Sequence, residues 1–327
     1  MRRDVALKVE RLAVEHVGAH EAAPGIPWLV EGLWPEQGVG FLGGHPKACK
    51  SWLALDIALS VASRTAALGE FAVERGGSVL LFAAEDSPAM VRARFQGMAA
   101  QRKLALSEVP IQLVLENGLR LESARDQARL HATLEELRPV LLVLDPFVRM
   151  TGIDENSAQE VSRVLAFLRE LQRSLELAIL VVHHVRKSAA GVNGGLALRG
   201  SGDFWAWSDT NLYLARKEAT LELAIEHRSS KAPQPVLFEL CDQELEGPYL
   251  RTCERPADPH ATASLSERLL AYLAQQATGA KLDPIRAALR VRTQSVVDAL
   301  RELEQRRLVQ RTDSGWQAVG SRETELP

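Results

Sequence analysis

The stretch Gly43-Gly44-His45-Pro46-Lys47-Ala48-Cys49-Lys50-Ser51 constrains this chain most, because it joins an apolar run, Val39-Gly40-Phe41-Leu42, to a helical pattern that starts at Trp52. Gly44, Lys50 and Ser51 have the spacing of the phosphate-binding pattern G-x-x-x-x-G-K-[ST]. In that pattern backbone N–H groups cradle phosphates, while the lysine and the hydroxyl reach the terminal phosphates and Mg²⁺. Cys49 stands where the pattern has its second glycine. The alternative is a glycine-rich turn between two core elements. As nucleotide-binding residues we predict Gly44, Lys47, Ala48, Cys49, Lys50, Ser51 and Trp52.

Short apolar runs alternate with longer helical patterns after this stretch. Strands are predicted at 39–42, 79–83, 111–114, 140–144 and 178–182, and amphipathic helices at 87–104, 122–137 and 157–175. Such alternation is typical of a parallel sheet covered by helices. From residue 210 the pattern changes, and 211–214, 220–226 and 235–240 are expected to be hairpin-linked strands that extend the sheet. The sequence therefore predicts an α/β fold with a mostly parallel central sheet.

A segment rich in Pro, Ala and polar residues, 254–263, is predicted to be a linker. After it, three short helices at 265–276, 283–290 and 293–306 and a β-hairpin at 308–319 indicate a small winged helix-turn-helix. The predicted organisation is an N-terminal arm at 1–26, a P-loop ATPase domain at 27–253, the linker, the winged helix-turn-helix at 264–320 and a tail at 321–327.

Two carboxylates end apolar strands, where ligands of parallel sheets bind. Asp145 closes the run Leu142-Val143-Leu144 and is predicted to hold Mg²⁺ with Ser51, the alternative being an Asp that caps a turn before Pro146. Glu85 ends the strand at 79–84 and is the candidate general base for the attacking water. Its neighbour Asp86 is the rival, although a helix N-cap would also favour an Asp there.

His183 and His184 close the strand at 178–182. One imidazole is expected to contact the γ-phosphate, and a core histidine is the alternative for the other. Metal binding by the pair is less favoured, because no Cys or further His lies at ligand spacing.

The charge of the chain is unevenly distributed. Residues 264–320 carry nine Lys/Arg against six Asp/Glu, a balance of +3, which leaves −6 for the rest of a chain whose net charge is −3. A basic C-terminal end indicates a polyanionic partner. The residues expected to contact duplex DNA are Arg292, Gln294, Ser295, Arg301, Arg306, Arg307 and Arg311, and protein docking is the alternative role of this part.

Composition favours a globular cytoplasmic protein. Apolar residues make up 46% of the chain, and no apolar run approaches the roughly 20 residues that cross a bilayer, so no membrane association is expected. The start, Met1-Arg2-Arg3-Asp4, lacks an apolar signal core. The three cysteines form no disulfide framework and fit a reducing cytoplasm.

Between residues 28 and 240 the chain resembles the RepA-type RecA-like ATPases, which are plasmid replicative helicases related to DnaB. Besides the phosphate-binding stretch, the resemblance depends on five groups of residues, which are Trp28-Leu29-Val30-Glu31-Gly32-Leu33, Ala84-Glu85-Asp86, Leu144-Asp145-Pro146, Val182-His183-His184-Val185-Arg186-Lys187, and Leu198-Arg199-Gly200-Ser201-Gly202 followed by Asp209.

The resemblance implies a homo-oligomeric ring, usually a hexamer, with ATP and Mg²⁺ between subunits and single-stranded DNA in the channel. It gives Glu85 the role of the catalytic base and His183 or His184 that of the γ-phosphate sensor. Arg199 resembles the arginine that acts across the subunit interface, while Arg228 and Lys231 are second-rank interface residues. Cys49 departs from the family pattern. Its side chain lies where the backbone must approach the phosphates closely, so it is expected to affect the rate of ATP hydrolysis.

The sequence thus predicts an ATP-hydrolysing, DNA-associated RecA-like motor of the helicase or translocase type. The alternative is a nucleotide-switched DNA-binding regulator, in which the altered loop binds ATP with slow or absent hydrolysis.

Overall fold

The computed structural model describes residues 14, 16, 18, 25–116, 118–185, 202–217, 220–242, 247–254, 264–276, 278–289 and 291–319. It divides into two compact units, residues 1–253 and 254–327. Arg199 and most of the predicted arm, linker and tail lie outside the described residues.

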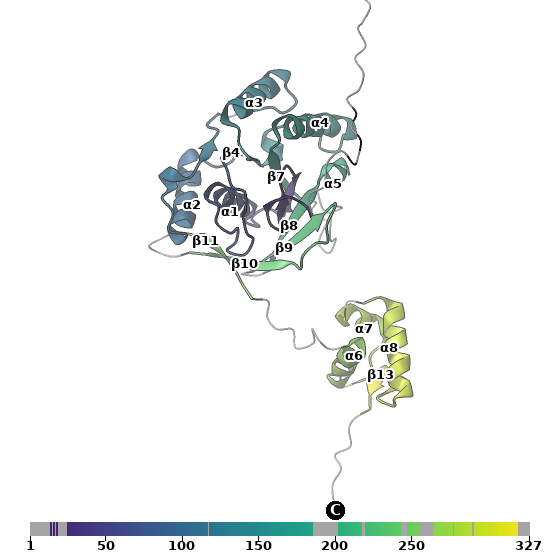
Figure 1. The fold of residues 1–327 in the computed structure, drawn as a ribbon. Helices are drawn as coiled ribbons and strands as arrows, with labels where there is room; N and C mark the ends of the chain where they lie inside the picture. Colours follow the sequence, from purple (N-terminus) through teal and green to yellow (C-terminus); the bar gives the residue numbers. More distant parts are fainter. Residues whose placement is uncertain are drawn as a thin grey trace, which may run out of the picture. The chain divides into compact units, whose positions relative to one another are not determined.

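The first unit is built on a nine-stranded sheet with the order β11-β10-β9-β8-β3-β7-β6-β4-β5 (Figure 1). The six strands from β8 to β5 are parallel, which confirms the predicted mostly parallel sheet. Their bounds are β3 Val39–Gly44, β4 Val79–Ala83, β5 Ile111–Leu113, β6 Leu141–Asp145, β7 Ala178–His184 and β8 Thr210–Lys217.

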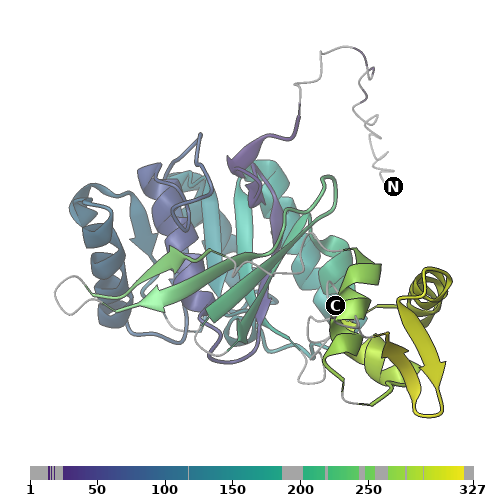
Figure 2. The same ribbon diagram turned by 90° about the horizontal axis from the view of Figure 1, so that it is seen from below.

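Three antiparallel strands, β9 Thr220–His227, β10 Val236–Cys241 and β11 Tyr249–Thr252, extend this sheet beyond β8 (green in Figure 2). β11 contacts the first two helices of the unit. A separate short pair, β1 Trp28–Val30 and β2 Trp34–Pro35, precedes β3. Neither β11 nor this pair was predicted from the sequence.

Helices cover both faces of the sheet because alternate residues of each buried strand point to opposite sides. On one side α1 Lys50–Ser63 and α2 Pro88–Gln101 pack on a core that includes Leu81, Val143 and Leu180. On the other side α3 Ala124–Leu137, α4 Ala158–Leu175 and α5 Asp203–Trp207 pack on a core that includes Leu142 and Val181. Two 3-10 turns, η1 Leu106–Glu108 and η2 Phe147–Arg149, complete the unit.

The second unit has its own hydrophobic core. Helices α6 Leu265–Ala274, α7 Leu282–Leu289 and α8 Thr293–Gln305 are followed by the antiparallel strands β12 Val309–Thr312 and β13 Gly315–Ala318. Ser264 and Glu267 form a capping box at the start of α6. The buried side chains Leu273, Ile285 and Leu300 join the three helices. Within the described residues no helix has both the length and the apolar character required to cross a membrane.

Candidate nucleotide-binding site

The loop between β3 and α1 has the backbone shape of a phosphate cradle. Lys47 and Cys49 both adopt left-handed conformations, with φ of 63° and 61°. Successive residues that alternate between such conformations direct backbone N–H groups toward one point, where an anion binds. Gly44 is required at the strand end, because a Cβ there would lie 2.6 Å from the carbonyl oxygen of Leu214 in β8.

Lys50, the first residue of α1, extends back across this loop. Its Nζ donates to the carbonyl oxygens of Gly44 and His45, both at 2.9 Å, and lies 3.4 Å from Nδ1 of His184. Burial lowers the pKa of Lys50, while the charges of Asp145 and Glu85 oppose that shift. The ammonium is therefore held at the mouth of the loop by carbonyls that phosphate oxygens can replace.

Asp145 is buried at the end of β6 and accepts a hydrogen bond from Ser51. Burial raises its pKa to about 6, and the neighbouring carboxylates of Asp86 and Glu85 add to the shift. Ser51 and Lys50 act in the opposite direction.

A carboxylate beside a hydroxyl fits Mg²⁺, which proteins bind through one or two oxygen ligands together with phosphates of the substrate. No group of three or more His, Cys, Asp or Glu side chains within the described residues is arranged as a metal site of its own. Ser51 and Asp145 are the residues that would hold a Mg²⁺ ion together with phosphates of a nucleotide.

The two acidic residues after β4 have different partners. Oε1 of Glu85 accepts from Nε of Arg149 at 2.9 Å. Asp86 accepts two bonds from Arg94, at 2.6 and 3.0 Å, and the Arg94 guanidinium lies 5.2 Å from the centre of the Trp52 ring. The N-cap of α2 is Ser87, whose side chain accepts from the N–H of Met90. Asp86 is thus not the N-cap of α2. It accepts two hydrogen bonds from an arginine, whereas Glu85 accepts one.

Most residues of the loop line one hollow with a volume of about 390 Å³, whereas Gly44, Asp86 and Arg149 are not among its lining residues. Of the predicted residues it brings together Lys47, Ala48, Cys49, Lys50, Ser51, Trp52, Glu85, Asp145 and His184. Sequence reasoning missed Arg94, which also lines the hollow.

The predicted histidine pair divides between the hollow and the core. His184 lines the hollow beside Lys50, whereas His183 is 1% exposed. The His183 ring lies 5.8, 5.6 and 4.8 Å from the rings of Phe41, Phe147 and Phe204. Of the two, only His184 lines the hollow.

Cys49 has a partner that the sequence did not indicate. Its Sγ accepts from Nη2 of Arg216, near the end of β8, at 2.9 Å. The side chain that replaces the glycine of the pattern is therefore bound to the neighbouring strand.

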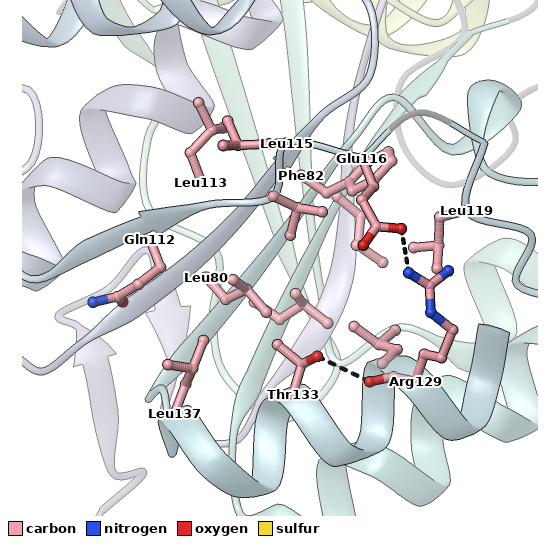
Figure 3. A pocket seen from close by; sticks show the side chains of 14 residues that line it. Leu80, Phe82, Gln112, Leu113, Leu115, Glu116, Leu119, Arg129, Thr133 and Leu137 are labelled. Carbon is pink, nitrogen blue, oxygen red and sulfur yellow. Dashed lines mark hydrogen bonds and ion pairs between the residues drawn. The ribbon is translucent and has the colours of Figure 1, made fainter.

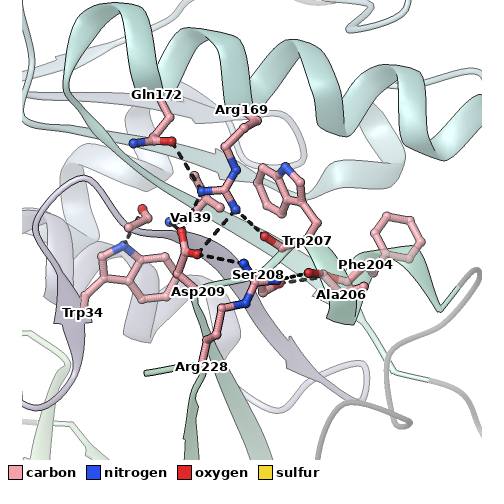
Figure 4. Close-up of polar contacts among 11 residues, drawn as sticks. Trp34, Val39, Arg169, Gln172, Phe204, Ala206, Trp207, Ser208, Asp209 and Arg228 are labelled. Atoms are coloured by element: carbon pink, nitrogen blue, oxygen red, sulfur yellow. Dashed lines mark hydrogen bonds and ion pairs between the residues drawn. The ribbon is translucent and has the colours of Figure 1, made fainter. Parts of the chain in front are cut away.

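Arg228 belongs to a network centred on Asp209 (Figure 4). Asp209 accepts from the Val39 N–H at 3.1 Å and from Arg169 at 2.8 Å, and it pairs with Arg228 at 3.5 Å. Arg228 also donates to the carbonyl oxygen of Ala206. These contacts place Arg228 in a polar network within this chain. Lys231 is exposed on the segment after β9.

The predicted DNA-binding residues lie at the N-cap of α8, on α8 and on the segment that follows it. All are exposed except Ser295, which is half-buried. Gln294 donates to Asp298 at 2.9 Å, and Arg306 donates to Glu302 at 3.3 Å. Arg292 occupies the N-cap position of α8, and Arg311 lies on β12. Arg301 and Arg307 complete the set.

A second hollow, of about 330 Å³, lies beside the edge strand β5 and is mostly apolar (Figure 3). Leu80, Phe82 and Leu137 are among its lining residues, and Glu116 and Arg129 form an ion pair there. The residues that line it include neither the loop before α1 nor Asp145 and Glu85.

Comparison with known proteins agrees with this geometry. Residues 6–190 match the family described as AAA domain, so the chain belongs to that family. The crystal structure of the RadB recombinase is similar at a TM-score of 0.48 and 19% identity, covering 67% of this chain and 92% of that chain. No match is found among curated proteins.

Proposed function

We propose that this protein is an ATP-hydrolysing, DNA-associated RecA-like motor of the RepA and DnaB type. The observation that supports it best is the convergence of Lys50, Ser51, Asp145 and Glu85 on one hollow at the carboxyl edge of the parallel strands. Phosphoryl transfer needs this set, because catalysis consists mainly of positioning and charge stabilisation.

In the proposed reaction each residue has a defined part. The loop N–H groups and Lys50 bind the phosphates, and Ser51 and Asp145 would hold Mg²⁺, which neutralises phosphate charge when bound. Glu85 accepts a proton from water, whose oxygen bonds to the γ-phosphorus as the bond to the β–γ bridging oxygen breaks. The products are ADP and inorganic phosphate.

The proposed association with DNA depends on the second unit. Three helices followed by a hairpin suit a winged helix-turn-helix, with α8 as the recognition helix. Arg306, Arg307 and Arg311 are exposed at the end of α8 and on the hairpin, where phosphate contacts would be made.

Steady-state ATP turnover, measured with and without a single-stranded oligonucleotide, tests the proposal. We expect turnover that rises with the oligonucleotide and is lost in Lys50→Ala. Turnover that the oligonucleotide leaves unchanged would contradict the motor, and the absence of any turnover would contradict the enzyme.

The second candidate is a nucleotide-switched DNA-binding regulator. It is favoured by one observation, a phosphate loop with a cysteine at a left-handed position, where glycine is the usual residue. ATP binding that changes duplex affinity, without turnover, would select this candidate.

The proposed ring has its own test through Arg199, which lies outside the described residues. If Arg199 acts on the neighbouring subunit's ATP, mixing Arg199→Ala with Lys50→Ala protein will restore some activity. A mixed oligomer without any such rescue would mean that Arg199 acts within its own subunit or is only structural.

A further inference from the structure

The carboxylate proposed as general base is bound by a cation from the adjoining segment. Nε of Arg149 lies 2.9 Å from Oε1 of Glu85, while Glu85 also lines the phosphate hollow. The two side chains are 61% and 48% exposed. The pair thus stands at the rim of the site, between the reacting centre and solvent.

The backbone of Arg149 is fixed from both sides. Arg149 is the last residue of η2, which follows Asp145 and Pro146 and is anchored by the fully buried Phe147 and Met150. Its carbonyl oxygen accepts from Nη1 of Arg120 at 3.0 Å. The guanidinium can therefore leave Glu85 without displacement of Asp145, because only side-chain torsions need to change.

An ion pair of this exposure is weak and easily exchanged. While it lasts, the guanidinium occupies the Glu85 carboxylate, so that a proton from water is accepted less readily. We propose that Arg149 is a positioning residue that restrains Glu85 until a phosphate of a bound nucleic-acid strand takes its guanidinium. The proposal rests on the function proposed above and names how that site is regulated.

Three features favour a nucleic-acid phosphate as the competing group. Arg149 is more exposed than its carboxylate partner. Arg120, also exposed, donates to the Arg149 carbonyl oxygen, so that a second cation contacts the segment that carries Arg149. Arginine binds phosphate through two parallel N–H bonds, whereas Glu85 receives a single Nε bond here.

The test compares ATP turnover of wild type, Arg149→Ala and Arg149→Lys, with and without a single-stranded oligothymidylate. Arg149→Ala is expected to raise kcat without oligonucleotide by about two- to fivefold, the range that an exposed ion pair can restrain. ATP affinity stays unchanged, and stimulation by the oligonucleotide is reduced. Arg149→Lys, which keeps a charge but only one compact donor group, should fall between the two.

Two further variants show whether the effect passes through Glu85. In the Glu85→Gln background, Arg149→Ala should give no increase. Arg129→Ala is the matched control, because it removes another surface arginine of the same unit, paired with Glu116, and should leave turnover unchanged.

A kcat that is unchanged or lower in Arg149→Ala, while wild type hydrolyses ATP, overturns the restraint and leaves the proposed function standing. An increase that persists in the Glu85→Gln background also overturns it. If neither wild type nor Arg149→Ala hydrolyses ATP, with or without the oligonucleotide, the proposed function itself fails and the restraint with it.

Discussion

Replacing Cys49 by glycine and by alanine separates two effects of this side chain on the phosphate loop. Cys49 has φ 61° and ψ 25°, a left-handed conformation that costs an L-residue about 1–2 kcal/mol. Glycine removes that cost but loses about 0.5–1 kcal/mol more conformational entropy when it is ordered. The net gain for Cys49→Gly over Cys49→Ala is therefore about 0.5–1 kcal/mol, and where the loop is ordered into this conformation by the phosphates it corresponds to about two- to fivefold in ATP affinity.

The alanine variant tests how much the sulfur atom of Cys49 contributes to ATP affinity. Cys49→Ala keeps the Cβ and the left-handed backbone but loses the contact between Sγ and Arg216. Sulfur is a weak acceptor, so we expect wild type and Cys49→Ala to bind ATP within about twofold of each other.

Isothermal titration calorimetry with ATP and Mg²⁺ measures these differences, with Lys50→Ala as the non-binding control. Turnover of the same proteins shows whether Cys49 also limits catalysis, in which case Cys49→Gly is the fastest. Equal affinity and turnover for the glycine and alanine variants would refute the strain argument. A glycine variant that binds more weakly would mean that the loop needs the rigidity of a Cβ.

The remaining predictions address chemistry, stability and DNA association. Glu85→Gln should lower kcat by about 10²–10⁴-fold at unchanged ATP affinity, whereas Asp145→Asn should weaken ATP binding only when Mg²⁺ is present; titrations with and without EDTA check this. Asp56→Ala should lower the free energy of unfolding by about 3 kcal/mol in urea denaturation, because the side chain is 1% exposed and its loss leaves the Arg102 guanidinium, 11% exposed, without its carboxylate. Removal of residues 254–327 should leave a folded ATPase with weaker duplex binding and a shallower salt dependence; an unchanged salt slope would assign that unit to protein docking.

The elements predicted correctly from the sequence are those with a clear hydrophobic pattern. β4, β6 and β7 are continuous apolar runs, and they lie within a residue or two of the predicted ranges. β11 was missed because Tyr249–Thr252 has only four residues and no clear alternation. The start of α1 was set at Trp52 rather than Lys50, because the apolar pattern begins only after the loop residues that form the first turn.

The candidate site was predictable where it depends on strand ends alone. Lys50, Glu85 and Asp145 meet because the carboxyl ends of parallel strands share one edge. Arg149 and Arg216 were not predictable. Their contacts with Glu85 and Cys49 join segments 64 and 167 residues apart, and no local pattern specifies which cation meets which partner.

The side chains of His183 and His184 point to opposite faces of the sheet because they are neighbours in one strand. That they differ in environment could therefore be predicted from the sequence. Successive residues of a strand point to opposite faces, so two adjacent histidines in β7 cannot both reach one ligand. The residues before the histidines do not indicate which imidazole faces the hollow. All of them, up to Val182, are apolar, so neither face of the strand is distinguished by polar side chains. The register decides it: His184 lies opposite Gly44, the residue from which the phosphate loop departs, while His183 lies opposite Gly43. The aromatic rings of Phe41, Phe147 and Phe204 then fill the face that His183 shares. A change of one residue in the pairing of β7 with β3 would exchange the two histidines, which makes this register the feature that places a titratable group beside Lys50.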